Sequence, residues 1–405
     1  MNKEKRRVPK LRFPGFTEDW EQRKLESLFT KYEDKVKTPN SGYWRLGLRS
    51  HCKGTFHTYV DAGNELETAE MNRVQSGNFI LNITFAWERA LAVTNEEDQD
   101  KLVSHRFPQF KPNSDLAIDF FKHTLMDKRF KHHLELSSPG GAGRNKVLKI
   151  ADMLKYELLV PSIKEQNEIS SFLNNVDYII TLHQRKLEHL NLKKKALLQK
   201  LFPKNGERYP ELRFPGFTDA WEQRKLGDFT NQINTFVNPE DAKLPLWSLT
   251  AEAGLIEKSD RYERDFLVKK KDQFKRIETN TLVYNPMNIT IGSIDIYTGL
   301  YPIAVSGYYV SIVYNKNIDT DFLKEVLLLP SSLKMYKNYA TGSLIERQRV
   351  QYPTFSKLQL LLPNLDEQKA IGQLFKSLNL NITLHQRKLE HLQLQKKALL
   401  QQMFV

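Results

Sequence analysis

The chain has 405 residues, of which 40% are hydrophobic and 11% aromatic, enough apolar material for the cores of two or three domains. Lys and Arg outnumber Asp and Glu by 61 to 48, so the formal net charge is +13. A surplus of this size favours an anionic partner, with nucleic acid first and a membrane surface second; a basic protein without such a partner is the alternative.

Three further features concern the compartment. Cys52 is the only cysteine, so the chain can form no internal disulfide, which fits a reducing environment. The N-terminal stretch MNKEKRRVPKLRF carries positive charge without an apolar run behind it, which argues against a signal peptide. No run approaches the roughly 20 apolar residues that span a bilayer. We therefore expect a cytoplasmic protein.

The first predicted element is a lead-in segment that occurs twice. Residues 11–25 read LRFPGFTEDWEQRKL and residues 212–226 read LRFPGFTDAWEQRKL, with thirteen of fifteen letters identical. A shift of about 200 residues is a domain duplication, because solenoid repeats are only about 20–50 residues long. We define the two lead-in segments as residues 9–29 and 210–230.

Each lead-in is followed by a variable segment, residues 30–150 and residues 231–352. Both segments mix short β-rich runs with turn residues, and both end in a helix-like stretch, at 116–134 and at 319–336. The fold class we predict is α+β, with two homologous domains of the same descent. Three pairs of short stretches support common descent: FILN (79–82) with LVYN (282–285), VSHRF (103–107) with VSGYY (305–309), and YWRL (43–46) with LWSL (246–249).

A long helix is predicted after each variable segment. The block TLHQRKLEHL occupies 181–190 and again 383–392. Ser162 and Glu165 have the spacing of a capping box, and Asn364 is the equivalent N-cap residue in the second copy.

Apolar residues in both helices then step by four and three, which is the pattern of a coiled-coil seam. His183, Lys194, His385 and Lys396 interrupt the seam at equivalent places. We expect the two helices to pair in antiparallel fashion; the alternative is that each buries its stripe on its own domain. The seam positions are Ile169, Phe172 or Leu173, Val176, Ile180, Leu187, Leu190, Leu197 and Leu201, then Ile371, Phe375, Leu378, Ile382, Leu389, Leu392, Leu399 and Met403.

These elements divide the chain into four parts. Residues 1–160 and 204–362 form two globular domains, each with its lead-in, and residues 161–203 and 363–405 form two long helices.

The motifs give no catalytic constellation. No G-x-x-x-x-G-K-[ST] phosphate loop is present. The Gly-rich stretch 137–145 is interpreted as a turn, or as a backbone contact to DNA phosphate aided by Arg144. The sequence YNPMN (284–288) departs from the Asn-Pro-Pro-aromatic motif of amino-methyltransferases at its third and fourth positions. The histidine spacings do not place two imidazoles on one helix face, so no metal site is expected.

Recognition residues are more informative. The variable segments carry Arg, Lys, Asn, His and aromatic residues in loop-like settings, and Arg and Asn read guanine and adenine in the major groove while Lys contacts phosphate. For any single residue a plain surface role is the alternative. The candidate DNA-binding residues are Trp87, Arg89, His105, Arg106, Arg144, Lys269, Lys270, Lys271, Asn285, Asn288, Tyr308, Arg347 and Arg349.

This arrangement resembles the specificity subunit of type I restriction-modification systems. The resemblance rests on the paired LRFPGFT-x-x-WEQRKL lead-ins, the LPxxxEQxxI-like turns at 158–169 and 360–371, and the long helices that follow. It implies that each variable domain reads one half of a split site in double-stranded DNA. It also implies that the helices form an antiparallel spacer.

The same resemblance implies protein partners. Two methyltransferase subunits, which hold S-adenosylmethionine, would dock on the repeated parts, and nuclease subunits that use ATP and Mg²⁺ would join them; no cofactor is expected on this chain. Because a repeated surface implies two copies of one partner, we predict partner contacts at Phe13, Phe16, Trp20, His189, Phe214, Phe217, Trp221 and His391. Two alternatives are a coiled-coil scaffold without DNA reading and a stand-alone DNA-modifying enzyme.

Overall fold

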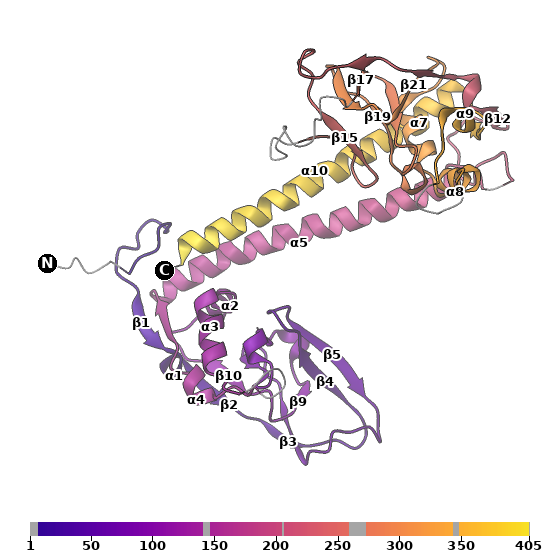
Figure 1. The fold of residues 1–405 in the computed structure, drawn as a ribbon. Coiled ribbons are helices and arrows are strands. Elements are labelled where there is room, and N and C mark those ends of the chain that lie inside the picture. The colour runs from indigo at the N-terminus through magenta and orange to yellow at the C-terminus, as the bar shows by residue number, and fades with distance from the viewer. Residues whose placement is uncertain (1–6, 141–145, 205, 259–272, 343–347, 405) are drawn as a thin grey trace. The chain divides into compact units, whose positions relative to one another are not determined.

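The computed structural model describes residues 7–140, 146–204, 206–258, 273–342 and 348–404. The chain divides into two compact units, Met1–Leu182 with Lys388–Val405, and His183–Arg387. We call them unit 1 and unit 2. Each contains one globular domain and a portion of both long helices (Figure 1). In the described part of the chain, no helix has the length and apolar character that a bilayer crossing requires.

Unit 1 contains two larger sheets, a two-stranded pair and short helices. One sheet has the order β2 (Phe29–Tyr32), β10 (Gln109–Pro112), β7 (Phe79–Leu81), β8 (Leu91–Val93). A five-stranded sheet has the order β3 (Lys35–Lys37), β6 (Glu70–Arg73), β9 (Leu102–Val103), β4 (Tyr43–Leu48), β5 (Thr55–Val60). The remaining elements are β1 (Glu21–Lys24) paired with β11 (Glu157–Val160), α1 (Leu25–Leu28), α2 (Ile118–Thr124), α3 (Lys128–Leu136), α4 (Ile150–Met153), and the 3-10 turns η1 (Ala86–Glu88) and η2 (Glu96–Asp98).

Unit 2 repeats this plan. Its four-stranded sheet has the order β13 (Thr230–Ile233), β21 (Val310–Tyr314), β18 (Thr281–Tyr284), β19 (Ile294–Tyr297). A second sheet has the order β14 (Phe236–Val237), β17 (Phe274–Ile277), β20 (Ile303–Ser306). The other elements are β12 (Glu222–Lys225) with β22 (Gln359–Leu362), β15 (Trp247–Thr250) with β16 (Gly254–Glu257), η4 (Leu226–Asp228), η5 (Ile289–Ile291), α7 (Thr320–Leu327), α8 (Pro330–Tyr339) and α9 (Tyr352–Phe355).

The matching strand orders confirm the predicted α+β class and the three short sequence echoes. FILN and LVYN lie on β7 and β18, VSHRF and VSGYY begin on β9 and β20, and YWRL and LWSL lie on β4 and β15. Each helix-like stretch is two helices rather than one. Asp127 caps α3 by accepting a hydrogen bond from the backbone N–H of Arg129, and Pro330 starts α8.

The long helices α5 (Ile163–Lys200) and α10 (Leu365–Met403) cover the predicted ranges to within three residues. In unit 1, Ile169 and Leu173 near the start of α5 share a core with Met403 at the end of α10. In unit 2, Leu190 and Leu201 share a core with residues near the start of α10, including Phe375. The end of each helix therefore packs where the other begins, which is the predicted antiparallel pairing. The alternative, in which each helix packs only on its own domain, is wrong.

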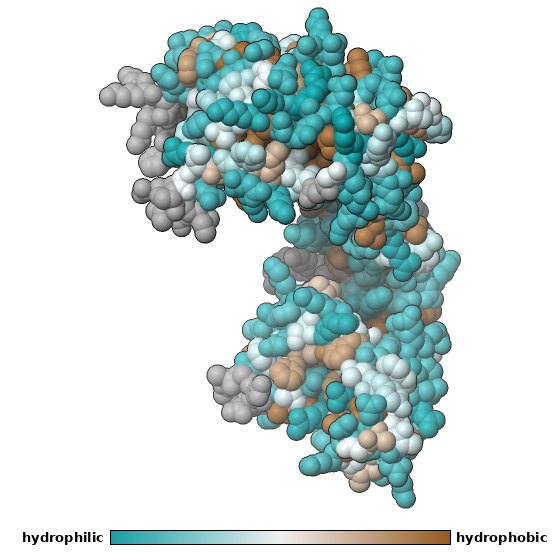
Figure 2. Space-filling model, turned by 90° about the vertical axis from the view of Figure 1, so that its right-hand side faces the viewer, coloured by the Kyte–Doolittle hydropathy of each residue, from teal (hydrophilic) through white to brown (hydrophobic). Residues whose placement is uncertain are grey.

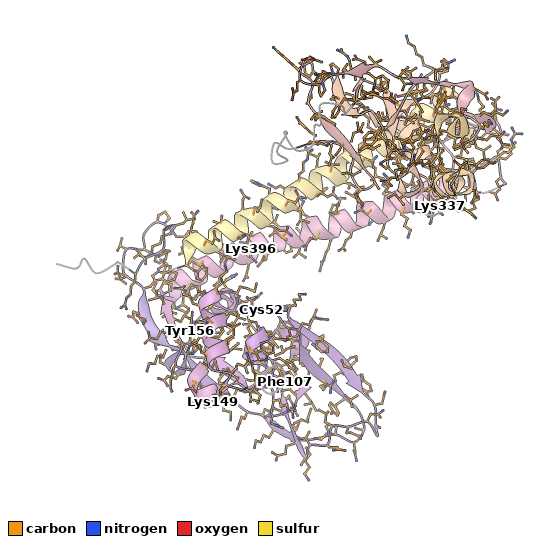
Figure 3. All side chains as sticks on the ribbon, viewed as in Figure 1. Cys52, Phe107, Lys149, Tyr156, Lys337 and Lys396 are labelled. Carbon is orange, nitrogen blue, oxygen red and sulfur yellow. The ribbon has the colours of Figure 1, made fainter. Side chains whose placement is uncertain are left out.

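The seam follows the predicted spacing. All the second-copy positions are buried or half-buried, and in the first copy Leu173 is buried while Phe172 remains 37% exposed, so Leu173 is the seam residue. The lysines that interrupt the seam both have polar partners. Lys194 Nζ donates a hydrogen bond to Asn379 Oδ1 at 2.7 Å and lies 3.1 Å from Glu325 Oε2. Lys396, labelled on α10 in Figure 3, forms an ion pair with Asp177.

Residues of the repeated lead-in segments form equivalent ion pairs within each unit. Arg12 forms a two-bond ion pair with Glu165, with nitrogen–oxygen distances of 2.7 and 2.8 Å, and Arg213 forms the same pair with Glu367 at 2.7 Å for both bonds. Both glutamates are 1% or less exposed. The lead-in thus anchors the first turn of the long helix in each unit.

This contact corrects the capping-box prediction. Ser162 Oγ and Asn364 Oδ1 accept hydrogen bonds from the backbone N–H of Glu165 and Glu367, at 3.4 and 2.9 Å, as expected of N-cap residues. However, the two glutamate carboxylates bond the lead-in arginines. A charge-assisted ion pair with two parallel hydrogen bonds is stronger than a hydrogen bond to the N-cap backbone, so each glutamate bonds the distant arginine instead.

Candidate nucleic-acid interface

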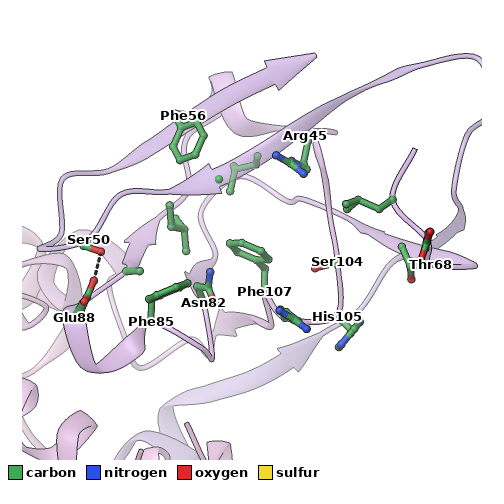
Figure 4. A pocket seen from close by; sticks show the side chains of 17 residues that line it. Arg45, Ser50, Phe56, Thr68, Asn82, Phe85, Glu88, Ser104, His105 and Phe107 are labelled. Carbon is green, nitrogen blue, oxygen red and sulfur yellow. Dashed lines mark hydrogen bonds between the residues drawn. The ribbon is translucent and has the colours of Figure 1, made fainter. Parts of the chain in front are cut away.

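The globular domain of unit 1 has an open cavity of about 660 Å³ beside its five-stranded sheet. Arg45 reaches it from β4, Glu88 from η1, and His105 from the turn between β9 and β10 (Figure 4). Arg106, in the same turn, also lines the cavity. The rest of the lining is partly aromatic, with Phe56, Phe85 and Phe107. Segments that lie far apart in the sequence therefore present cationic and aromatic side chains to one concave surface.

Local features hold this lining in place. Gly47 lies opposite Phe56 in the β4–β5 register, and a Cβ on Gly47 would collide with the Phe56 ring, so only glycine lets the ring lie across β4. Ser50 Oγ donates a hydrogen bond to Glu88 Oε2 at 2.9 Å. Asn82 Oδ1 accepts from the Thr84 N–H at 3.0 Å, a local turn that begins the loop to η1.

The cavity has cationic groups without acid partners. Within the described part of the chain, neither Arg45 nor Arg106 forms an ion pair, while the Glu88 carboxylate is engaged by Ser50. Arg106 and His105 are exposed. Unpaired guanidinium groups at an open concave surface suit phosphate and base edges, which accept two parallel hydrogen bonds from one arginine.

Two other predicted residues of this domain lie beside the cavity. Trp87 is on η1, where its Nε1 donates to the Thr84 carbonyl at 3.2 Å and the Lys146 ammonium lies 5.0 Å from its ring centroid. Arg89 closes η1 with φ of 60°, and its Nε is buried without a hydrogen-bond partner in the described part of the chain. Arg89 is half-buried, so its guanidinium is less accessible to DNA than that of the exposed Arg106. Arg144 lies outside the described residues.

Unit 2 brings together a different set at the corresponding turn. Tyr308, in the turn between β20 and β21, is 43% exposed, and the Arg349 guanidinium lies 5.8 Å from its ring centroid. Asn288 is exposed at the start of η5, whereas Asn285 is half-buried and uses its Oδ1 to accept from the Met287 N–H at 3.0 Å. Lys269, Lys270, Lys271 and Arg347 lie outside the described residues.

Sequence reasoning missed Arg45, Phe56 and Lys275. Lys275 is only 4% exposed, its Nζ donates to the Tyr309 carbonyl at 2.7 Å, and it lies 5.6 Å from the Phe236 ring centroid. Burial lowers the pKa of this ammonium. Lys275 therefore supports the turn that carries Tyr308. Alternation along β4 could have indicated Arg45, but nothing local indicates that Lys275 is buried.

The predicted partner residues separate into three groups by their exposure. Trp20 and Trp221 are 2% and 0% exposed and pack edge-on against Phe120 and Phe322, so we assign both to the cores rather than to a partner surface. Four of the phenylalanines are half-buried, namely Phe13, Phe16, Phe214 and Phe217. Both histidines, His189 and His391, are exposed. Within the described residues, no group of three His, Cys, Asp or Glu side chains could hold a metal ion.

Comparison with known proteins finds a family match over part of the chain and a similar fold. The family model for the type I restriction modification DNA specificity domain matches residues 17–192. The S subunit of a type I restriction-modification system from M. genitalium aligns with a TM-score of 0.61 at 14% identity, covering 98% of this chain and 99% of that chain. The HsdS subunit from Thermoanaerobacter tengcongensis aligns with a TM-score of 0.44 at 15% identity over 97% of each chain.

At 14% identity, the alignment with the M. genitalium S subunit shows that the two proteins share a fold. Residues 17–192 are similar to the type I restriction modification DNA specificity domain. This match agrees with the resemblance drawn from the repeated motifs.

Proposed function

We propose that the two globular domains read the two halves of a bipartite DNA site. Residues 1–160 and 204–362 are the target-recognition domains, and residues 161–203 and 363–405 are the spacer. The observation that carries this proposal is one scaffold with different surface residues. Arg106 corresponds to Tyr308, Arg89 to Gly292, and Arg45 to Ser248, on equivalent turns and strands. Shared topology with diverged contacts is what two different half-sites require.

The base-reading candidates follow from exposure. In the first domain these are Arg45, His105 and Arg106, with Trp87 and Arg89 beside them; in the second they are Asn288, Tyr308 and Arg349, with Asn285 behind. Arg144, Lys269, Lys270, Lys271 and Arg347 remain candidates for phosphate contact on their charge alone.

A domain exchange tests the assignment. Replacing residues 231–352 with the matching segment of a relative should change one half of the methylated site in the host methylome and leave the other half unchanged. A matched exchange of residues 30–150 should change the opposite half. A change in both halves from either exchange would contradict the one-domain, one-half-site assignment.

We also propose that two methyltransferase subunits dock on the repeated helices. Exposed apolar side chains recur at equivalent positions of α5 and α10: Tyr178 with Leu380, Leu182 with Leu384, and Leu192 with Leu394, each 44% exposed or more. Figure 2 shows a largely hydrophilic face in which apolar residues form small patches. Exposed leucine kept at the same place in both copies supports two copies of one apolar partner surface. Phe16, Phe217, His189 and His391 are further candidates.

Mass measurement of the assembled complex tests this docking. Leu192→Glu alone should reduce the number of bound methyltransferase subunits from two to one, and Leu192→Glu with Leu394→Glu should reduce it to none. Unchanged stoichiometry would contradict the proposal. We propose that the chain itself is non-catalytic, with S-adenosylmethionine on the methyltransferase subunits and ATP and Mg²⁺ on nuclease subunits. Micromolar binding of S-adenosylmethionine by the purified chain would support a stand-alone enzyme instead.

A further inference from the structure

One aromatic pair of unit 1 lies outside the cavity described above. Trp44 on β4 and Tyr59 on β5 stand directly opposite each other in the strand register. Their ring centroids are 5.3 Å apart with an interplanar angle of 66°. Trp44 is 51% exposed and Tyr59 is 47% exposed. All five tryptophans lie in the described part of the chain, and among them Trp44 is exposed while the others are buried or half-buried.

The scaffold does not require this exposure. Trp247 occupies the corresponding strand of unit 2, but it is half-buried and packs edge-on against Tyr297, with ring centroids 5.5 Å apart. Both strands carry tryptophan, and only the first presents it to solvent. Leaving two large rings exposed forgoes the free energy that their burial would contribute, so a ligand that covers them would recover it.

A glycine immediately before β4 makes room for this pair. Gly42 has φ of +86°, and a Cβ on this residue would lie 2.6 Å from the Tyr59 hydroxyl oxygen. Glycine at this turn therefore leaves room for the Tyr59 ring to stand against Trp44. Two rings that already pack against each other lose less conformational entropy on binding than two free side chains would.

Positive charge surrounds the tryptophan. A groove of about 530 Å³ is lined by Trp44 together with Lys37, Arg73 and Lys101, against one acid, Asp100. Arg73 reaches Asp34 only at 3.8 Å, and the Asp100 carboxylate accepts a hydrogen bond from Gln99. The groove thus joins a flat apolar ring to a surplus of cations. Side chains at successive strand positions point to opposite faces, so Trp44 points away from the face to which Arg45 points.

We propose that the groove at Trp44 is a binding site for single-stranded DNA, in which one unstacked base lies on the Trp44 ring and the flanking phosphates contact Lys37, Arg73 and Lys101. An aromatic face with a basic track beside it binds single strands with little sequence preference, because every base has a π-face. Tyr59 is a positioning residue that holds the indole edge-on. This site goes beyond the reading of duplex half-sites at the two turns.

The experiment uses the full-length chain and a fluorescein-labelled (dT)12 probe. Wild-type protein should bind the probe with quenching of tryptophan fluorescence. Trp44→Ala should weaken binding by about tenfold or more, since stacking of one base contributes about 1–3 kcal/mol. Trp44→Phe should retain most of the affinity and lose most of the quenching. Tyr301→Ala is the matched control, because Tyr301 is an exposed aromatic residue of unit 2 and should bind like wild type.

Salt dependence separates stacking from charge. Trp44→Ala should lower affinity at every salt concentration without changing the slope of log K against log salt. Lys37→Ser with Lys101→Ser should reduce that slope by up to about 1.4, at roughly 0.7 per phosphate contact. Equal probe affinity in wild type and Trp44→Ala, with no quenching in wild type, would overturn the proposal. Binding of duplex containing the bipartite site, measured alongside, would still report on half-site reading independently.

Discussion

His183 and His385 meet across the paired long helices with their Nδ1 atoms 2.8 Å apart. They are counterparts in the two copies of TLHQRKLEHL, so the contact joins identical positions of the repeat. Two identical Nδ1 atoms can share a hydrogen bond only if one donates and the other accepts, which requires the two imidazoles to be in different protonation states or tautomers. The seam is apolar on either side of this pair, at Ile180, Leu187, Ile382 and Leu389.

Replacing one of these histidines should destabilise the helix pair. His385→Leu removes the hydrogen bond between the two Nδ1 atoms, a loss of about 0.5–1.5 kcal/mol. His183→Leu with His385→Leu should recover that stability, because two leucines restore an apolar seam. Denaturant unfolding of the single and double variants gives the coupling energy. The exposed His189→Leu is the control, and additivity of the two single changes would contradict the contact.

A second pair of counterparts predicts a pH dependence. Unit 2 places Glu325 beside Lys194, and the position of Glu325 is occupied in unit 1 by His123. Burial, and next the charge of Lys396, lower the pKa of His123 to about 4 from 6.5. The folded state therefore disfavours the charged imidazole. Above pH 6.5 both folded and unfolded chains hold it neutral, and the folded state loses no stability.

As pH falls from 6.5 to about 4, the unfolded chain takes up the proton before the folded chain does, so stability should fall by up to about 3 kcal/mol. His123→Gln should flatten the unfolding free energy of unit 1 over this window, as measured by denaturant titration at several pH values. His132→Gln, on an exposed side chain, should keep the wild-type profile. An identical profile for His123→Gln would show that this imidazole is not the cause.

The buried ion pairs should anchor the units separately. Glu165→Gln removes the negative partner of Arg12, and breaking a buried pair typically costs 3–5 kcal/mol. Hydrogen exchange should rise in the lead-in segment 9–29 and at the start of α5, and stay unchanged around Arg213 and Glu367 in unit 2. Glu168→Gln, three residues away and exposed, is the control. Equal protection in Glu165→Gln and wild type would contradict an anchoring role.

DNA binding should depend strongly on salt. With about six phosphate contacts, affinity should fall about a thousandfold between 50 and 200 mM salt. Arg106→Ala should weaken binding to sites with the correct first half-site more than to sites with that half scrambled, since a base contact adds discrimination. Fluorescence anisotropy with both duplexes measures this. A flat salt titration would favour the coiled-coil scaffold without DNA reading.

The length of the helix pair should set the gap between the half-sites. One heptad inserted after His183 and another before His385 keeps the histidines together and returns the same helix face. Seven residues add about 10 Å, or about three base pairs, while also turning the duplex by about 100°. Binding to the original site should weaken, and a gap longer by three base pairs should restore it only in part. Unchanged affinity and an unchanged preferred gap would show that the helix pair does not set the distance between the half-sites.

Much of this architecture could be predicted because its signals are local or repeated. The four–three spacing from Ile169 to Leu201 predicts a buried stripe wherever the helix packs, since periodicity depends only on helix geometry. The two halves of the chain can be compared with each other, so weakly similar stretches such as FILN and LVYN indicate equivalent strands even without identical residues.

Only the tertiary structure decided which partner each repeated side chain meets. Glu165 has the spacing of a capping box, yet its carboxylate bonds Arg12, 153 positions away. Trp20 reads as a surface residue among charged neighbours, yet it is buried against Phe120 and Phe404, because the end of α10 packs into the first unit. Arg45, Glu88 and Arg106 line one cavity although turns and strands separate them. Periodicity and capping are encoded within a few neighbouring residues. Burial and ion pairing depend on which distant segments the fold brings together, and no local sequence pattern specifies those contacts.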